Sequence, residues 1–252
     1  PIPRRQRQMC IRDRLIDIGN TLAKIAVSDG ESILTEFKLR SIDLDFVKDV
    51  MKDNNVINSA ISNVSKPNQK LFDLCDSKSN LYTFKKEIKL PFHNPYDQGL
   101  VGEDRLSLIL GACSLYPRDN VLVVDLGTCI TYDIKTSENI YQAGGISPGL
   151  GLRKKSLFSG TVNLPEIEPI YPKSMLAFDT HSSISIGLLI GIQSEIEGMI
   201  KRYEEMYKNL KVVISGGDAN FLGDRIKNTI FTNSNFVFSG LNYLIEYNKL
   251  NE

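Results

Sequence analysis

LIDIGNT, residues 15–21, has a counterpart in VLVVDLGT, residues 121–128. Each stretch is an apolar run that ends in Asp, and it continues with a Gly, a small hydroxyl or amide residue and a second strand-like run. One such stretch is typical of an ordinary tight hairpin. Asp17 and Asp125, however, lie 108 positions apart, which is about the length of one compact domain half. The repetition therefore predicts a fold built from two similar halves.

The two stretches also carry the groups that are needed to hold phosphate. Gly lets a backbone approach a phosphate closely, turn amides and hydroxyls donate hydrogen bonds to its oxygens, and Asp can hold a cation or a water beside it. Two hairpins of this kind that face each other would bind a nucleotide. We therefore expect a nucleotide cleft between the halves.

The order of the expected elements repeats as well. Each half begins with an antiparallel three-stranded meander and continues with alternating helices and strands. In the first half we expect strands at 15–18, 22–27, 33–39 and 56–64, and helices at 43–51, 67–75 and 102–116. In the second half we expect strands at 121–125, 130–134, 140–143 and 212–215, a glycine-rich bend at 144–149, and helices at 150–158, 183–207 and near the end of the chain. This pattern predicts an α/β protein whose halves are residues 15–117 and 118–252.

Composition argues against a nucleic-acid or membrane partner. Thirty Lys and Arg residues balance thirty Asp and Glu residues, so no overall charge favours nucleic acid or an anionic membrane. No uninterrupted apolar run approaches the ~20 residues that span a bilayer. The four cysteines show no paired spacing, which is typical of a reducing, cytoplasmic compartment. Residues 1–14 are rich in Arg, and we expect a non-native or disordered tail there.

Two further stretches have chemical potential. Gly102-Glu103-Asp104-Arg105 opens a predicted helix, whose N-terminus favours anions. Asp104 and Arg105 either form a structural ion pair, or act as a general base for a substrate hydroxyl and an anchor for a carboxylate or phosphate. SGGDA, residues 215–219, would let a flat nucleobase approach, although a tight strand–helix connection explains it equally well. The chain has neither a Walker A motif nor GxGxxG, so a P-loop and a Rossmann site are unsupported.

Six motifs occur in order: DIGNT, GEDR, DLGTCITYD, AGGISPGL, TVNLP and SGGDA. This ordered set, which runs from about Leu15 to Asn248, resembles the type III pantothenate kinases. The resemblance implies the fold of the acetate and sugar kinase/Hsp70/actin group, with two similar actin- or ribonuclease-H-like halves whose mixed sheets are flanked by helices. It also implies ATP-dependent phosphorylation of pantothenate to 4'-phosphopantothenate, the first step of coenzyme A biosynthesis.

The resemblance further implies a role for individual residues. Asp17 would lie nearest the Mg²⁺ ion and the γ-phosphate of ATP, Asp125 would bind a monovalent cation (potassium or ammonium), and Asp104 would accept the proton of the substrate hydroxyl. The implied ATP-binding residues are Asp17, Ile18, Gly19, Asn20, Thr21, Leu22, Ala23, Lys24 and Thr128. The implied pantothenate-binding residues are Tyr96, Gly102, Glu103, Asp104, Arg105 and Thr180.

Three alternatives remain open. Another small-molecule kinase would keep both hairpins but lack GEDR and the segment around Thr180. A non-catalytic nucleotide-binding regulator, such as a transcription accessory factor, should have lost Asp17 or Asp104, and both are present. An actin-like assembly module would need a long polymerising insertion, and the sequence offers none.

We also expect a homodimer. The resemblance implies that the cation and pantothenate sites lie near a subunit interface. In addition, the predicted helix at 183–207 carries more apolar side chains than one helix face could bury in a monomer.

Overall fold

The computed structural model describes residues 12–84, 87–96, 100–226, 231–232 and 235–251. The chain forms two compact units, one of residues 1–115 with 237–252 and the other of residues 116–236. The last helix, α8 (Phe236–Lys249), therefore belongs almost entirely to the first unit, whereas the sequence had led us to place residues 118–252 together. Its Gly240 packs so closely on the helix α3 (Glu103–Leu115) that an added Cβ would lie 1.6 Å from the backbone oxygen of Ser107.

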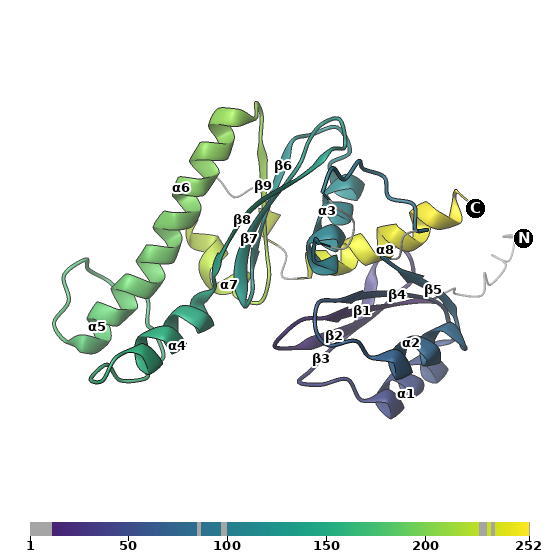
Figure 1. The fold of residues 1–252 in the computed structure, drawn as a ribbon, viewed down its shortest axis with the longest axis horizontal. Helices are drawn as coiled ribbons and strands as arrows, with labels where there is room; N and C mark the ends of the chain where they lie inside the picture. Colours follow the sequence, from purple (N-terminus) through teal and green to yellow (C-terminus); the bar gives the residue numbers. More distant parts are fainter. Residues whose placement is uncertain (1–11, 85–86, 97–99, 227–230, 233–234, 252) are drawn as a thin grey trace, which may run out of the picture. The chain divides into compact units, whose positions relative to one another are not determined.

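The first unit contains a five-stranded mixed sheet with the order β3-β2-β1-β4-β5 (Figure 1). Strand β1 pairs antiparallel with β2 and parallel with β4, and helices α1 and α2 pack on the face that carries Ile16, Ile25 and Ile61. The elements are β1 (Arg12–Ile18), β2 (Ala23–Ser28), β3 (Ile33–Leu39), α1 (Leu44–Asn54), β4 (Val56–Asn63), α2 (Gln69–Asp76), β5 (Asn80–Thr83) and α3 (Glu103–Leu115).

The second unit repeats this pairing strand for strand, in the order β10-β9-β6-β7-β8. Strand β6 pairs antiparallel with β7 and parallel with β9, as β1 does with β2 and β4. The elements are β6 (Val121–Leu126), β7 (Cys129–Lys135), β8 (Tyr141–Pro148), α4 (Leu150–Gly160), α5 (Thr180–Ser185), a π-helical segment (Ile186–Ile190), α6 (Gly191–Met206), β9 (Lys211–Ser215), α7 (Ala219–Leu222), a 3-10 turn (Gly223–Arg225) and β10 (Phe231–Thr232). The predicted fold of two similar halves, each with a mixed sheet flanked by helices, is confirmed.

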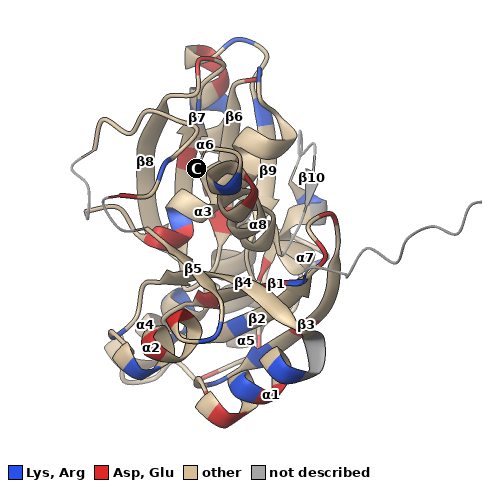
Figure 2. Ribbon diagram, turned by 90° about the vertical axis from the view of Figure 1, so that its right-hand side faces the viewer, with Lys and Arg blue, Asp and Glu red and all other residues tan. Residues whose placement is uncertain are grey.

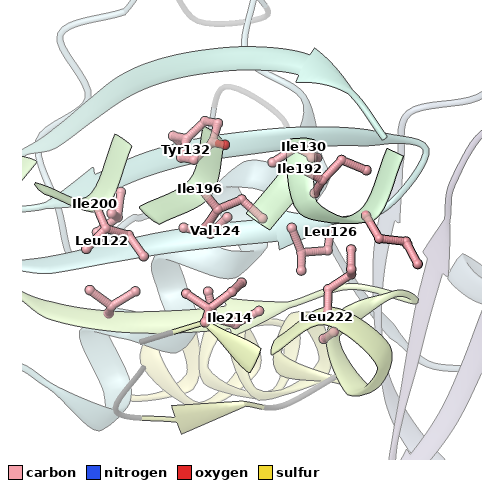
Figure 3. Close-up of a cluster of buried hydrophobic side chains, with 14 of the residues drawn as sticks. Leu122, Val124, Leu126, Ile130, Tyr132, Ile192, Ile196, Ile200, Ile214 and Leu222 are labelled. Atoms are coloured by element: carbon pink, nitrogen blue, oxygen red, sulfur yellow. The ribbon is translucent and has the colours of Figure 1, made fainter. Parts of the chain in front are cut away.

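The core of the second unit lies between its sheet and α6. Ile192, Ile196 and Ile200 recur every fourth residue, so they share one helix face, and Figure 3 shows them against Leu122 and Val124 of β6. In the helix expected at 183–207, Ile184, Leu188 and Leu189 are buried within the unit, whereas Ile186 and Ile190 are partly buried and Met206 is 69% exposed. The expectation that this helix carries more apolar surface than a monomer can bury stays a prediction. The continuous helix Thr180–Met206 spans 27 residues and is long and apolar enough to cross a membrane by length and composition alone, and 39% of its apolar window is buried within the unit.

The sequence predicted a glycine-rich bend at 144–149. This prediction is wrong for residues 144–148, because β8 continues through them to Pro148. Gly144 lies where an added Cβ would be 2.3 Å from the backbone oxygen of Tyr132 and 2.2 Å from the hydroxyl of Tyr203. The glycine therefore serves the close approach of neighbouring chain segments rather than a turn. The strand ends at Pro148, and the amide of the next residue, Gly149, donates to the Thr128 oxygen at 3.0 Å.

Strand β1 begins at Arg12, so the last three residues of the expected tail belong to the sheet, and residues 1–11 lie outside the described residues. Arg14 and Leu122 occupy equivalent positions in the two halves, because each lies three residues before the Asp of its hairpin. Both side chains are fully buried. Arg14 donates from Nη2 to the Ser59 hydroxyl at 2.7 Å, whereas its Nε and Nη1 have no hydrogen-bond partner. This burial lowers the pKa of the guanidinium, and the neighbouring Cys75 thiol acts in the opposite direction. A cation thus fills a position where the other half has a leucine.

Replacing Arg14 with Leu should stabilise the protein. The variant removes an incompletely paired buried charge, and Ser59 keeps its hydrogen bond with the Ser79 hydroxyl. We expect the free energy of unfolding in urea to rise by about 1–3 kcal/mol. Lys38→Leu, at an exposed position on β3, is the matched control and should change it by less than about 0.5 kcal/mol. A lower free energy of unfolding in Arg14→Leu would contradict this account of the strand.

Candidate functional site

Asp17 lies at the end of β1, the central strand of the first sheet. The register pairs it with Lys24 of β2 on one side and with Ser62 of β4 on the other. The hairpin between β1 and β2 is closed by a 3.0 Å hydrogen bond from the Gly19 amide to the Leu22 oxygen, and Asn20, Thr21 and Leu22 are exposed in its turn. The strand pairing alone thus surrounds one carboxylate with an ammonium and a hydroxyl.

The carboxylate of Asp17 is largely withdrawn from water. Burial raises its pKa to about 6, the Lys24 charge acts in the opposite direction, and the charge of Asp104 raises it further. Its Oδ1 atom is buried and has no hydrogen-bond partner. A buried carboxylate oxygen of this kind is destabilising unless a cation or a donor from a ligand reaches it.

The N-terminus of α3 brings the second carboxylate to this place. The Asn63 amide donates to Glu103 Oε2 at 2.7 Å, and the Arg105 amide donates to Asp104 Oδ1 at 2.7 Å. A Cβ added to Gly102 would lie 2.5 Å from Asp104 Oδ1, so the carboxylate of Asp104 fills the space that any other residue would need. Burial raises the pKa of Glu103, and the charge of Asp104 adds to this effect.

This cluster fits a divalent cation. It offers hard carboxylate oxygens, one of them unpartnered, and the repulsion between Asp17 and Asp104 would be relieved by a positive charge. Over the described ranges of the chain, no three His, Cys, Asp or Glu side chains are grouped so that they could hold a metal ion by themselves. A cation here would therefore take further ligands from phosphate oxygens or water, which is how Mg²⁺ is usually held beside a nucleotide.

The second hairpin is built more tightly than the first. Asp125 of β6 pairs with Thr131 of β7, whereas Asp17 pairs with Lys24, so the second loop is one residue shorter and has a hydroxyl where the first has an ammonium. Thr131 Oγ1 is buried and has no hydrogen-bond partner. The Gly127 amide donates to the Cys129 oxygen at 3.1 Å and closes the turn.

Two glycines from other elements pack against this hairpin. A Cβ on Gly149 would lie 2.2 Å from the Gly127 oxygen, and one on Gly216, whose φ is +98°, would lie 2.4 Å from the Leu126 oxygen. The Asp218 amide donates to that same Leu126 oxygen at 2.9 Å, and burial raises the pKa of the Asp218 carboxyl. The SGGDA stretch thus supports the hairpin at Asp125 directly, as a tight connection after β9.

The position of α4 depends on a polar network that the sequence did not reveal. Glu195 of α6 accepts hydrogen bonds from the Tyr132 hydroxyl at 3.1 Å and the Ser147 hydroxyl at 2.5 Å, and it forms an ion pair with Arg153 of α4. Burial opposes ionisation of Glu195, but the hydrogen bonds from Ser147 and Arg153 together with the charge of Arg153 hold its pKa below the ordinary value. Since α4 follows Gly149 directly, this network also fixes the chain beside Thr128.

The expected site residues thus fall into two groups. Within the first unit, the structure brings together Asp17, Lys24, Glu103 and Asp104, and adds Ser62 and Asn63, which no sequence signal marked. Tyr96 of the same unit is 48% exposed, and residues 97–99 beside it lie outside the described residues. Asp125 and Thr128 lie in the second hairpin, and Thr180 lies exposed at the start of α5, which Asp179 caps. Figure 2 shows acidic and basic residues mixed over the described chain.

Two solved structures show the same architecture. A Cytophaga hutchinsonii protein assigned as a sugar kinase has a TM-score of 0.53 and 12% identity, and the match covers 93% of this chain and 99% of that chain. A Campylobacter jejuni protein that is named for the Baf family of transcriptional activators has a TM-score of 0.61 and 24% identity, with 94% and 99% covered. At these identities the likeness shows the fold alone, which is that of the actin-like sugar kinases.

The sequence comparisons are more specific. Residues 15–202 match the family of type III pantothenate kinases. The type III pantothenate kinase of Christiangramia forsetii is 37% identical over 238 residues, which are 93% of this chain and 98% of that protein. The chain belongs to the type III pantothenate kinase family.

Asp17 is partly buried, with its Oδ1 atom withdrawn from solvent, and it should make the stability of the protein depend on pH. The substitution Asp17→Asn should remove this dependence. The pKa of Asp17 is about 6 in the folded protein against 3.8 ordinarily, so between these values the folded protein binds more protons than the unfolded chain. The free energy of unfolding of the wild type therefore falls as the pH rises through this range. We expect Asp17→Asn to match the wild type near pH 4 and to be more stable by about 1–3 kcal/mol at pH 7.

Urea unfolding in magnesium-free buffer at both pH values measures this difference. Asp49→Asn, at an exposed position of α1, controls for the substitution itself. If Asp17→Asn differed from the wild type by the same amount at pH 4 and pH 7, the buried carboxylate would have an ordinary pKa, contrary to this description of the site.

Proposed function

We propose that this protein phosphorylates pantothenate with ATP to give 4'-phosphopantothenate, the first step of coenzyme A biosynthesis. Membership of the type III pantothenate kinase family supports this activity. The observation that carries it in this chain is the buried, unpartnered oxygen of Asp17 beside the carboxylate of Asp104. Phosphoryl transfer requires little covalent chemistry from the protein but does require alignment and charge neutralisation, and this pair of carboxylates fits both needs.

ATP would be held by the first hairpin, from Asp17 to Lys24, and by Thr128 of the second. The exposed turn amides and hydroxyls of the first hairpin would donate to phosphate oxygens. Asp17 would bind Mg²⁺, which neutralises phosphate charge when bound. Asp125 would bind a monovalent cation, potassium or ammonium.

Pantothenate would be bound by Gly102, Asp104 and Arg105, together with Tyr96 and Thr180. Its primary hydroxyl would attack the γ-phosphorus of ATP and lose its proton to Asp104, while the bond from the γ-phosphorus to the bridging oxygen breaks and ADP leaves. Arg105, with its fixed cationic charge, is suited to anchor the carboxylate of the substrate.

The protein would act as a cytoplasmic homodimer. Exposed apolar side chains on the segment after α4 support the dimer: Val162 is 98% exposed and Phe178 is 90% exposed, and α4 itself has no buried residue. Apolar surface of this kind is typical of an interface with another chain. The retention of Asp17 and Asp104 disfavours a non-catalytic regulator of the same fold.

Asp104→Asn should separate catalysis from binding. The amide cannot accept the proton, so turnover should fall by about 10²–10⁴-fold while ATP affinity stays nearly unchanged. The assay is pantothenate-dependent release of ADP, measured with and without pantothenate, with ATP affinity taken from calorimetry. Asp76→Asn, exposed at the end of α2, is the control and should retain wild-type turnover. Near-normal turnover in Asp104→Asn would show that Asp104 has only a structural role. Absence of pantothenate-dependent ADP release in the wild type would refute the proposed activity itself.

Activity should also require a monovalent cation of the size of potassium, with Asp125 as its ligand. Sodium is smaller and holds its water more tightly, so it should substitute poorly. We expect Asp125→Ala to lose both the response to potassium and most of the turnover in the same ADP-release assay. Equal wild-type activity in potassium, sodium and Tris buffers would show that Asp125 does not hold such a cation.

A further inference from the structure

The carboxylate of Glu103 is engaged with the protein itself. Its Oε2 accepts a hydrogen bond of 2.7 Å from the backbone amide of Asn63, forty residues earlier in the chain. The residue is partly buried, and burial raises the pKa of its carboxyl, while the Asn63 amide acts against that shift. Glu103 is thus joined to the end of β4, a different element from its own helix.

The amide of Asn63 needs such a partner because of the sheet topology. Alternate amides of a parallel strand point to opposite neighbours, and the Val64 amide donates to Ile18 of β1 at 3.0 Å. The Asn63 amide therefore points to the other side, that of β5. Strand β5 pairs with β4 only as far as Ile61 opposite Thr83, so Asn63 lies beyond the end of that ladder. Since β5 ends too early to offer a carbonyl oxygen to the Asn63 amide, the carboxylate of Glu103 accepts this hydrogen bond instead.

The residue next to Asn63 completes the connection to the site. Ser62 pairs directly with Asp17, so the strand end that Glu103 holds is the one that faces Asp17. Asp104 follows Glu103 in the first turn of α3, and its carboxylate is close enough to raise the pKa of Asp17. The bond from Asn63 to Glu103 therefore fixes the helix turn that carries Asp104 against the strand that faces Asp17.

We propose that Glu103 is a positioning residue, which sets the distance between the carboxylates of Asp104 and Asp17 through the backbone amide of Asn63 and does not bind substrate. This inference rests on the proposed function, in which Asp104 accepts the proton of the substrate hydroxyl and Asp17 binds the metal ion. It refines the substrate-binding role that the sequence resemblance implied for Glu103. Glutamine keeps an acceptor oxygen at the same place, whereas alanine leaves the Asn63 amide without one.

Steady-state kinetics of Glu103→Ala and Glu103→Gln test the positioning role. In Glu103→Ala we expect kcat to fall by about 10–100-fold, because Asp104 is displaced from its geometry, and KM for pantothenate to change by less than about threefold. Glu103→Gln should restore kcat to within about threefold of the wild type. Glu31→Ala, at an exposed turn position of the same unit, is the matched control and should behave as the wild type.

Hydrogen exchange at the Asn63 amide provides a readout that does not require activity. Exchange in the full-length protein should be at least about tenfold faster in Glu103→Ala than in the wild type or in Glu103→Gln. Unchanged exchange at Asn63, or a large rise in KM with unchanged kcat, would overturn the proposal and make Glu103 a substrate ligand or a surface residue. Failure of the proposed kinase activity would show separately, in a wild type that releases no ADP on addition of pantothenate.

Discussion

The pairing of β1 with both of its neighbours is the constraint on which the site depends. Asp17 ends a central strand, so its side chain is enclosed by Lys24 on one side and Ser62 on the other. Enclosure removes water from the carboxylate and raises its pKa, and one of its oxygens has no partner within the protein. A fold stable enough to bury this group can hold it ready for a cation without rearrangement, which is the electrostatic preorganisation that phosphoryl transfer uses.

The two halves use the same topology with different chemistry at the strand end. Where the first hairpin has Lys24 opposite its Asp, the second has Thr131, and the second loop is one residue shorter and covered by Gly149 and Gly216. An ammonium beside a carboxylate suits a site for phosphate and a divalent ion. The unpartnered hydroxyl of Thr131 opposite Asp125 is a neutral oxygen ligand, which agrees with the singly charged cation proposed for the second hairpin.

Much of the fold and part of the site could be predicted from the sequence. The duplicated Asp-Gly stretches gave the two halves, and GEDR marked the helix start that carries Asp104, because both signals are local. Ser62 and Asn63 could not be found in this way, since their importance comes from strand register and from the early end of β5. The continuation of β8 through Gly144 and the packing of α8 on the first unit likewise depend on contacts between distant residues.

A carbon-13 NMR titration of the Asp17 carboxyl in the intact chain tests the proposed cation site most directly, with Asp17→Asn used to assign the signal. In the absence of divalent ions the account predicts a titration midpoint of about 6. On addition of Mg²⁺ with a non-hydrolysable ATP analogue, the midpoint should fall, because a bound cation favours the charged carboxylate. A midpoint near the ordinary value of about 4 in the free protein, or one that does not move when the nucleotide and Mg²⁺ are added, would contradict it.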